Sequence, residues 1–271
     1  MTEDEERKQW LVKYNEEHED LLKQWDNLSK KNNHYPSDEE NPLRNVFISD
    51  GIAYPEIWFK NEIRPLFVLK EAYDSSGNKE PWNEVKEFIV EAKHEPIKGT
   101  SKTWKKLCLW SHNIFEAPIE QVVYWDDKYL KQIAVINIKK YGGRNPSENN
   151  DLEWHAGEYA KKIYQQIALI KPTVIICGYT GWLLDIVWKE TGKGEKIRTS
   201  PKGRLHLVKT EDINAVLIDF WHPSCTKNHS IEWQEDMEAF HRYLSEHALI
   251  GQDPVPVEPP YPGDSENEKK M

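Results

Sequence analysis

The chain has 271 residues, of which 38% are apolar and 11% aromatic, and it carries a net charge of -10. This is enough apolar material for one sizeable core, and no apolar run approaches the ~18 residues that a membrane-spanning helix needs. Three widely separated cysteines exclude a disulfide framework and a four-cysteine metal or cluster site, so we expect an unexported, cytoplasmic protein.

The negative charge at first argues against a nucleic-acid partner, because phosphate binding depends on Lys and Arg. The acidic excess, however, lies mainly at the two ends, since residues 51–250 hold 28 acidic and 27 basic side chains. Seven of these basic side chains lie between residues 189 and 209. We interpret this stretch either as a phosphate-facing patch or as a solvated loop.

The two ends of the chain differ from its middle. Over residues 3–30, apolar side chains recur at near-helical spacing, which predicts an amphipathic helix that packs on the domain, and residues 1–45 form this helix and its linker. Residues 251–271 are polar and rich in proline, which is typical of a disordered tail. Residues 46–250 therefore form the folded domain.

Within this domain, short apolar runs alternate with longer amphipathic segments, as in α/β folds. A helix is predicted over residues 159–170, ending before Pro172. Four apolar runs predict buried strands, at residues 64–69, 133–136, 173–178 and 215–220.

Polar residues follow three of these strands. Glu71 and Asp74 come after the first strand, Asn137 ends the second, and His222 follows the fourth. The carboxyl ends of parallel strands share one edge of a sheet, where ligands bind, so we expect these side chains to converge on one pocket.

The set suits a reaction in which charge develops on a planar heterocycle. The Asn137 amide can offer a donor and an acceptor to the edge of a base. His222 can donate to an oxygen that becomes anionic as the base departs. A carboxylate can stabilise an oxocarbenium-like sugar or orient the attacking water, and this chemistry requires no metal and no cofactor.

At these residues the sequence resembles the uracil-DNA glycosylase superfamily, especially its family-4 type. Val68-Leu69-Lys70-Glu71-Ala72 is similar to the family's strand followed by G-E-A-P-G. Three later motifs, in the family's order over roughly residues 64 to 228, look like Asn137-Ile138-Lys139-Lys140 with Arg144-Asn145-Pro146, Lys171-Pro172 with an apolar strand ending at Gly178, and Trp221-His222-Pro223-Ser224.

The resemblance implies a three-layer α/β/α fold with a central, mainly parallel four-stranded sheet. It implies a DNA glycosylase that flips a base and hydrolyses its N-glycosidic bond, leaving an abasic site. Glu71 takes the place of the motif carboxylate, Asn137 of the base-reading amide, and His222 of the donor to the base oxygen. A stacking aromatic should complete the pocket, for which Trp82, Trp104 and Trp110 are candidates.

We therefore expect a site made of three groups of residues. The expected catalytic residues are Glu71, His222 and Asp74. The expected base-binding residues are Asn137, Ala72, Tyr73 and Trp104. The expected DNA contacts are Lys139, Lys140, Arg144, Ser224, Thr226 and Lys227.

The sequence also departs from the family pattern. Family-4 enzymes hold an iron–sulfur cluster through four cysteines, so this chain should have no cluster. Lys70 and Tyr73 replace the family's Gly and Pro, and Asp74 stands where some uracil enzymes place a tyrosine. The resemblance implies uracil as the substrate, and a carboxylate at position 74, which favours an amino or hydroxyl donor, extends this expectation to a modified pyrimidine. Modified cytosine in phage DNA is one candidate, with a role in phage defence as in some members of the superfamily.

Two other classes of function stay open. A module that binds a base or nucleotide without cutting it would bind DNA and leave every glycosidic bond intact. A small-nucleoside hydrolase would act on free nucleosides without depending on the basic stretch at residues 189–209. A thiol-nucleophile role for Cys225, beside His222, is disfavoured, because the sequence marks no second His and no Asn or Asp as an orienting residue, and because Cys225 falls in the expected DNA-facing loop.

Overall fold

The computed structural model describes residues 2–31, 46–72, 80–91, 101–116, 127–142, 147–198, 204–225 and 229–246. The predicted linker and the predicted tail at residues 251–271 lie outside these ranges. Among the helices of the described part, none has the length and apolar character needed to cross a membrane.

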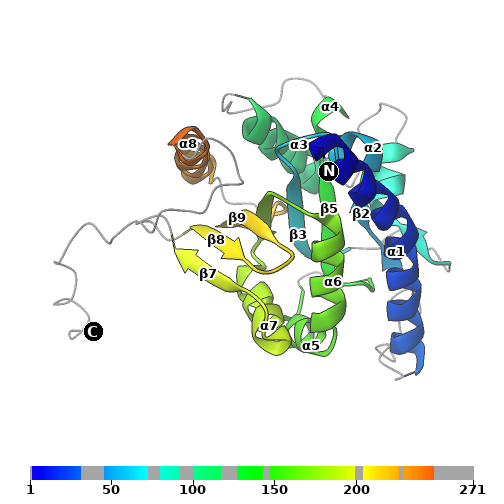
Figure 1. Cartoon of the computed structure of the whole chain (residues 1–271). Coiled ribbons are helices and arrows are strands. Elements are labelled where there is room, and N and C mark those ends of the chain that lie inside the picture. Colours follow the sequence, from blue (N-terminus) through cyan, green and yellow to red (C-terminus); the bar gives the residue numbers. More distant parts are fainter. Residues whose placement is uncertain are drawn as a thin grey trace, which may run out of the picture.

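The fold is mixed α/β, built on a seven-stranded, mostly parallel sheet with the order β2-β5-β3-β6-β9-β8-β7 (Figure 1). Its four central strands are mutually parallel and correspond to the four predicted strands. They are β5 (Ala134–Lys139), β3 (Pro65–Glu71), β6 (Val174–Gly178) and β9 (Asn214–Phe220). These strands are almost entirely buried, which explains why their sequences are continuous apolar runs without alternation.

The sheet is larger than the four strands that were expected. Antiparallel strands extend both sides: β2 (Gly51–Ile52) pairs with β5, and β8 (Leu205–Lys209) and β7 (Glu195–Arg198) continue from β9. A separate parallel pair joins β1 (Ile48–Ser49) to β4 (Trp82–Asn83). The basic stretch at residues 189–209 thus contains a β-hairpin. These strands are short or partly exposed, so no long apolar run marks them.

Helices cover both faces of the sheet. One face packs against α1 (Glu3–Lys31), α5 (Asn149–Glu158), α6 (Ala160–Ile170) and α7 (Gly181–Thr191). The other packs against a π-helical turn (Lys86–Val90), α3 (Ser101–Phe115) and α8 (Ser230–Glu246). Two short helices, α2 (Pro55–Trp58) and α4 (Asp127–Leu130), lie near the amino ends of β3 and β5 in the chain. The α6 helix ends at Lys171 in a left-handed conformation before Pro172, as predicted.

The predicted N-terminal helix is confirmed and belongs to the core. Figure 1 shows α1 alongside α6, and its Tyr14, Leu22 and Trp25 share one apolar cluster with residues of β3 and β5. The Ile52 backbone N–H donates to the Tyr14 hydroxyl at 2.9 Å, which ties α1 to β2. The first 31 residues are thus packed into the domain rather than appended to it.

Candidate active site

The carboxyl ends of the parallel strands bring the predicted polar residues to one edge of the sheet. Asn137 on β5 lies opposite Leu69 on β3, and Lys139 lies opposite Glu71. The end of β6 pairs with the end of β9, where Gly178 faces Phe220. His222 follows Phe220 by two residues, so Glu71, Asn137 and His222 all belong to this edge, as the sequence predicted.

Glu71 is buried and ion-paired. One of its oxygens lies 3.1 Å from Lys139 Nζ, and both side chains are at most 5% exposed. Lys139 also donates to Asp151 at 2.5 Å. The second oxygen, Glu71 Oε1, is buried and has no hydrogen-bond partner among the described residues. Within the described part of the chain, Glu71 therefore keeps one acceptor without a partner, whereas Lys139 is held inside the protein.

Asn137 is 2% exposed and fixed through both its backbone and its side chain. Its backbone N–H donates to Asp50 at 2.7 Å, and its Nδ2 donates to Glu84 Oε2 at 2.5 Å. Its carbonyl oxygen Oδ1 is buried and lacks a partner within the described ranges. As far as the described residues show, the amide thus keeps an unused acceptor in the second half of β5.

Glu84 and Asp50 were not predicted as site residues. Glu84 comes directly after β4, and Asp50 lies between β1 and β2, so neither follows a strand long enough to give a clear sequence signal. Burial, with a smaller contribution from the nearby Asp50 charge, raises the pKa of Glu84 to about 7. At neutral pH both the protonated and the ionised form of this carboxyl group are therefore populated.

The partner of Asp50 is Lys140. The Lys140 Nζ lies 2.7 and 2.6 Å from the two Asp50 oxygens, and neither side chain is exposed. Gln166 on α6 donates to Asp50 at 2.8 Å and contacts His18 on α1 at 3.1 Å. Burial lowers the pKa of His18 to about 3, so this histidine is neutral. This buried network joins α1 and α6 to the backbone of Asn137.

Two expected DNA contacts are therefore corrected. Lys139 and Lys140 were expected to bind phosphate, but each is buried against carboxylates and neither ammonium group reaches the surface. Removing either from its partners would leave an uncompensated buried charge, which is costly. Both lysines hold the site together instead of contacting DNA.

His222 is positioned by Ser224. The Ser224 backbone N–H donates to His222 Nδ1 at 3.2 Å, and the Ser224 hydroxyl lies 2.7 Å from the same nitrogen. Because Nδ1 accepts a hydrogen bond, we assign the ring proton to Nε2. Burial, and then the charges of Lys70 and Lys106, lower the pKa of His222 to about 4. The ring is therefore neutral at physiological pH, with an N–H donor on Nε2.

Exposed aromatic rings lie beside His222. Trp221 is 40% exposed and stacks between Tyr179 and His229, with ring centroids 6.1 and 4.5 Å away. Tyr179 is 44% exposed, adopts a positive φ of 59°, and has Lys70 Nζ 4.7 Å from its ring centre. A left-handed non-glycine residue is uncommon and often marks a functional site. Sequence reasoning did not single out Tyr179, because nothing in the sequence indicates its backbone conformation.

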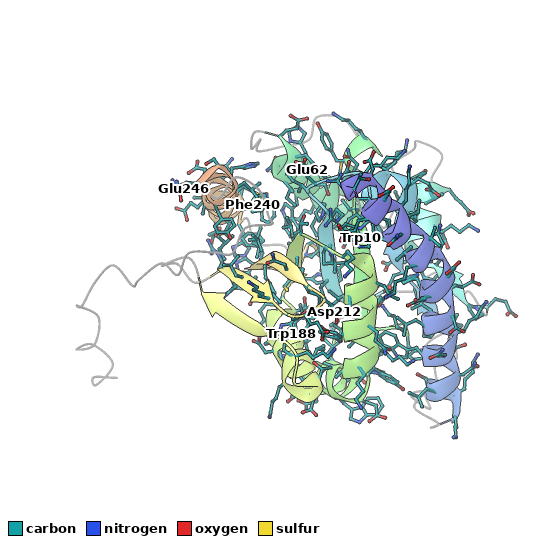
Figure 2. All side chains as sticks on the ribbon, in the orientation of Figure 1. Trp10, Glu62, Trp188, Asp212, Phe240 and Glu246 are labelled. Atoms are coloured by element: carbon teal, nitrogen blue, oxygen red, sulfur yellow. The ribbon has the colours of Figure 1, made fainter. Side chains whose placement is uncertain are left out.

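Two cavities differ in their relation to this edge. One of about 180 Å³ is lined by His222 and by residues of α3, β9, α8 and the connection between β9 and α8, among them Lys106, Trp110, Phe220, Trp221, His229 and Trp233. The larger, of about 650 Å³, is lined by residues of α1, α6 and the β8–β9 connection, including Trp10 and Asp212, which Figure 2 labels. The larger cavity is lined by none of the predicted site residues. The smaller is lined by His222 but not by Glu71 or Asn137, so neither cavity joins the three residues that were expected to share a pocket, and we place the candidate site at the strand edge.

The other predicted residues have mixed outcomes. Ala72 is buried directly after β3, at the expected edge. Trp104 is a correction: its ring packs against Phe88 within the apolar cluster on the α3 side of the sheet, so it serves the core. Ser224 is exposed, but its hydroxyl contacts His222. Tyr73, Asp74, Arg144, Thr226 and Lys227 lie outside the described residues.

No protein-family model matches the sequence, and no curated protein matches it. The likeness to the uracil-DNA glycosylase superfamily thus rests on the four motifs and on their order along the chain.

Proposed function

We propose that this protein is a DNA glycosylase, which flips a target base out of DNA and hydrolyses its N-glycosidic bond to leave an abasic site. The observation that carries the proposal is the neutral His222, whose Nε2–H lies at the same sheet edge as the Glu71 and Asn137 oxygens that have no hydrogen-bond partner among the described residues. A donor for the departing base, an acceptor for water and an amide for the base edge are the groups that this hydrolysis needs.

In this mechanism the C1′–N bond breaks and its electron pair leaves with the base. His222 Nε2–H donates a hydrogen bond to a base oxygen as negative charge develops there. The neutral imidazole already carries this proton, so no change in its protonation is needed. The water oxygen bonds to C1′ while its proton passes to Glu71, which accepts through Oε1. The departing base takes up a proton from the solvent, Glu71 afterwards releases the water proton to the solvent, and Lys139 holds the Glu71 carboxylate in place.

The surface around His222 supports DNA as the partner. Trp221 and Tyr179 belong to a stack of partly exposed rings whose uncovered edges unpaired bases can contact, and Lys70 and Lys106 add positive charge near His222. Proteins that bind single strands combine aromatic platforms with basic side chains in this way. The substrate is uracil or a modified pyrimidine, with modified cytosine of phage DNA, and thus a defence role, as a candidate.

The test is mass-spectrometric detection of free bases released from DNAs that contain uracil, hypoxanthine, or methylated, hydroxymethylated or glucosylated cytosine. We expect the wild type to release one base, and His222→Ala and Asn137→Ala to reduce the rate by at least ~100-fold. His241→Ala is the control. His241 lies on α8 and contacts the carbonyl oxygen of Asn113, near the carboxyl end of α3. Release that survives in His222→Ala would contradict the mechanism.

A non-catalytic DNA-binding module is the second candidate. It is favoured by the ion pair between Glu71 and Lys139, which occupies one carboxylate oxygen with a buried cation. Such a module would bind the DNA panel tightly and release no base from any member. Measurable binding with no release, in wild type and Glu71→Ala alike, would select this function.

A further inference from the structure

The turn that carries His222 is closed by hydrogen bonds within residues 222–225, directly after β9. The Cys225 backbone N–H donates to the His222 carbonyl oxygen at 2.8 Å, and the Ser224 backbone N–H donates to His222 Nδ1 at 3.2 Å. The orientation of the imidazole therefore depends on this turn. A short turn with exposed backbone opens easily unless another element holds it.

Lys106 on α3 provides such a hold. Its Nζ donates to the carbonyl oxygen of Cys225 at 2.8 Å, and the two residues are 119 positions apart in the chain. Hydrogen bonds from charged donors are stronger than those between neutral groups. The contact thus joins α3 to the end of the turn, three residues after His222.

Lys106 and His222 also line one cavity, the cavity of about 180 Å³, together with His229. Burial, and then the charges of Lys70 and Lys106, lower the pKa of His222. Burial lowers the pKa of Lys106 as well, and its interaction with Cys225 acts in the opposite direction. The groups that surround the imidazole are therefore two lysines, a thiol and a second histidine. Among them, Lys106 both contacts the turn and acts on the charge of His222.

We propose that Lys106 is a positioning residue for His222, which fixes the turn through Cys225 and so holds the Nε2–H donor at the sheet edge. This inference rests on the proposed function, because it concerns the donor of that reaction. Lys106 acts through His222 and not on the departing base. A lysine that served only as a phosphate contact would change the affinity for DNA and leave the turn unchanged.

The first test measures the turn in the full-length protein without DNA. Hydrogen exchange of the Cys225 backbone N–H, followed by NMR, reports opening of the turn, because this N–H is bonded within it. Lys106→Met keeps the length of the side chain and removes its donor, so exchange should become about tenfold faster or more. Lys106→Arg can still donate to the Cys225 oxygen, and its exchange rate should stay within about threefold of the wild type.

Lys70→Met separates the contact from the charge. Lys70 also acts on the charge of His222, but its Nζ lies over the Tyr179 ring. Lys70→Met and Lys106→Met should each raise the pKa of His222, measured by NMR titration of the ring, because each removes a positive charge that disfavours the imidazolium. Faster exchange of Cys225 should appear in Lys106→Met alone. Lys105→Gln, at an exposed position of α3, is the control and should change neither quantity.

Base release distinguishes positioning from DNA binding. With saturating DNA, the single-turnover rate of Lys106→Met should fall about tenfold or more, because a displaced donor no longer meets the base oxygen. Lys106→Arg should keep at least about a third of the wild-type rate. A weaker affinity for DNA with an unchanged saturated rate would identify Lys106 as a phosphate contact and overturn the inference.

The outcomes separate this inference from the proposed function. Unchanged exchange of Cys225 in Lys106→Met, or equally faster exchange in Lys70→Met, would overturn the role of Lys106 even if the wild type releases a base. Faster exchange in Lys106→Met that is restored in Lys106→Arg, in a protein that releases no base from any DNA, would keep the hold on His222 and overturn the glycosylase.

Discussion

At the scale of single residues, the site is dominated by carboxylates in different environments. Glu71 is paired with Lys139, Asp50 with Lys140, and Glu84 has only the amide of Asn137 at hydrogen-bond distance among the described contacts. A paired carboxylate stays ionised when buried, whereas one without a cation is destabilised as a charge. The three acids therefore differ in their surroundings: Glu71 and Asp50 are each paired with a buried lysine, whereas burial raises the pKa of Glu84 to about 7.

The stability of the protein should depend on Glu84 between pH 4.5 and 7. Its pKa is about 7 in the folded protein and 4.5 when solvated, so the folded state binds more protons in this window. The free energy of unfolding should therefore fall as pH rises from 4.5 to 7, by about 3 kcal/mol for this group. Below pH 4.5 and above pH 7, the contribution of Glu84 to the free energy of unfolding should not change with pH.

Urea unfolding of the wild type and Glu84→Gln across this pH range checks the prediction. Histidines whose pKa is lowered in the folded protein, such as His18 and His222, lower the free energy of unfolding on acidification. Their contribution therefore has the opposite slope with pH. They are present in both proteins, so the difference between the two curves isolates Glu84. A difference that does not change with pH would contradict the raised pKa.

At the scale of elements, the contact between α1 and β2 depends on a glycine. Gly51 has a φ of 142°, and a Cβ there would lie 2.5 Å from the Tyr14 hydroxyl and 2.7 Å from the His18 ring. Both rings are buried and stacked on each other with centroids 4.5 Å apart, so neither can move aside easily. The helix can approach the strand this closely only because position 51 has no side chain.

Gly51→Ala should therefore lower the free energy of unfolding by about 3 kcal/mol, the scale of overpacking with added backbone strain. Gly157→Ala on α5 is the matched control. The nearest atom to its new Cβ is Ile186 Cγ2 at 3.9 Å, and alanine in a helix is favoured by about 1 kcal/mol. Denaturant unfolding of the two variants should thus give shifts of opposite sign, and equal shifts would refute the close packing.

At the scale of the whole molecule, α1 contributes to the same core as the sheet. It buries Tyr14, Leu21, Leu22 and Trp25, and its His18 belongs to the network that leads through Gln166 to Asp50. Each large buried apolar side chain stabilises the fold by about 1.5–3 kcal/mol, and the total stability of a domain is about 5–15 kcal/mol. Four such side chains amount to much of that total.

Deletion of residues 2–31 should accordingly abolish cooperative folding, and the intact chain should unfold in a single transition. Circular dichroism during thermal unfolding measures both. A truncated protein that keeps a sharp transition near the wild-type midpoint would show that α1 is a dispensable extension.

The sequence by itself determined the α/β class, the N-terminal helix, the four central strands and the shared edge of Glu71, Asn137 and His222. These follow from local patterns, because buried parallel strands need continuous apolar runs and parallel strands end at one edge. The antiparallel strands β2, β7 and β8 were missed because they are short or partly exposed, and their pairing depends on neighbours distant in the sequence.

Only the tertiary structure decided the state of each charge. Lys139 and Lys140 are ordinary basic residues in the sequence, and their burial depends on Glu71, Asp151 and Asp50, which come from other elements. Glu84 acquires its raised pKa, and Tyr179 and Trp221 their exposed stack, from packing between distant segments. Desolvation and charge pairing depend on three-dimensional neighbours, so no local pattern could indicate which carboxylate would face Asn137.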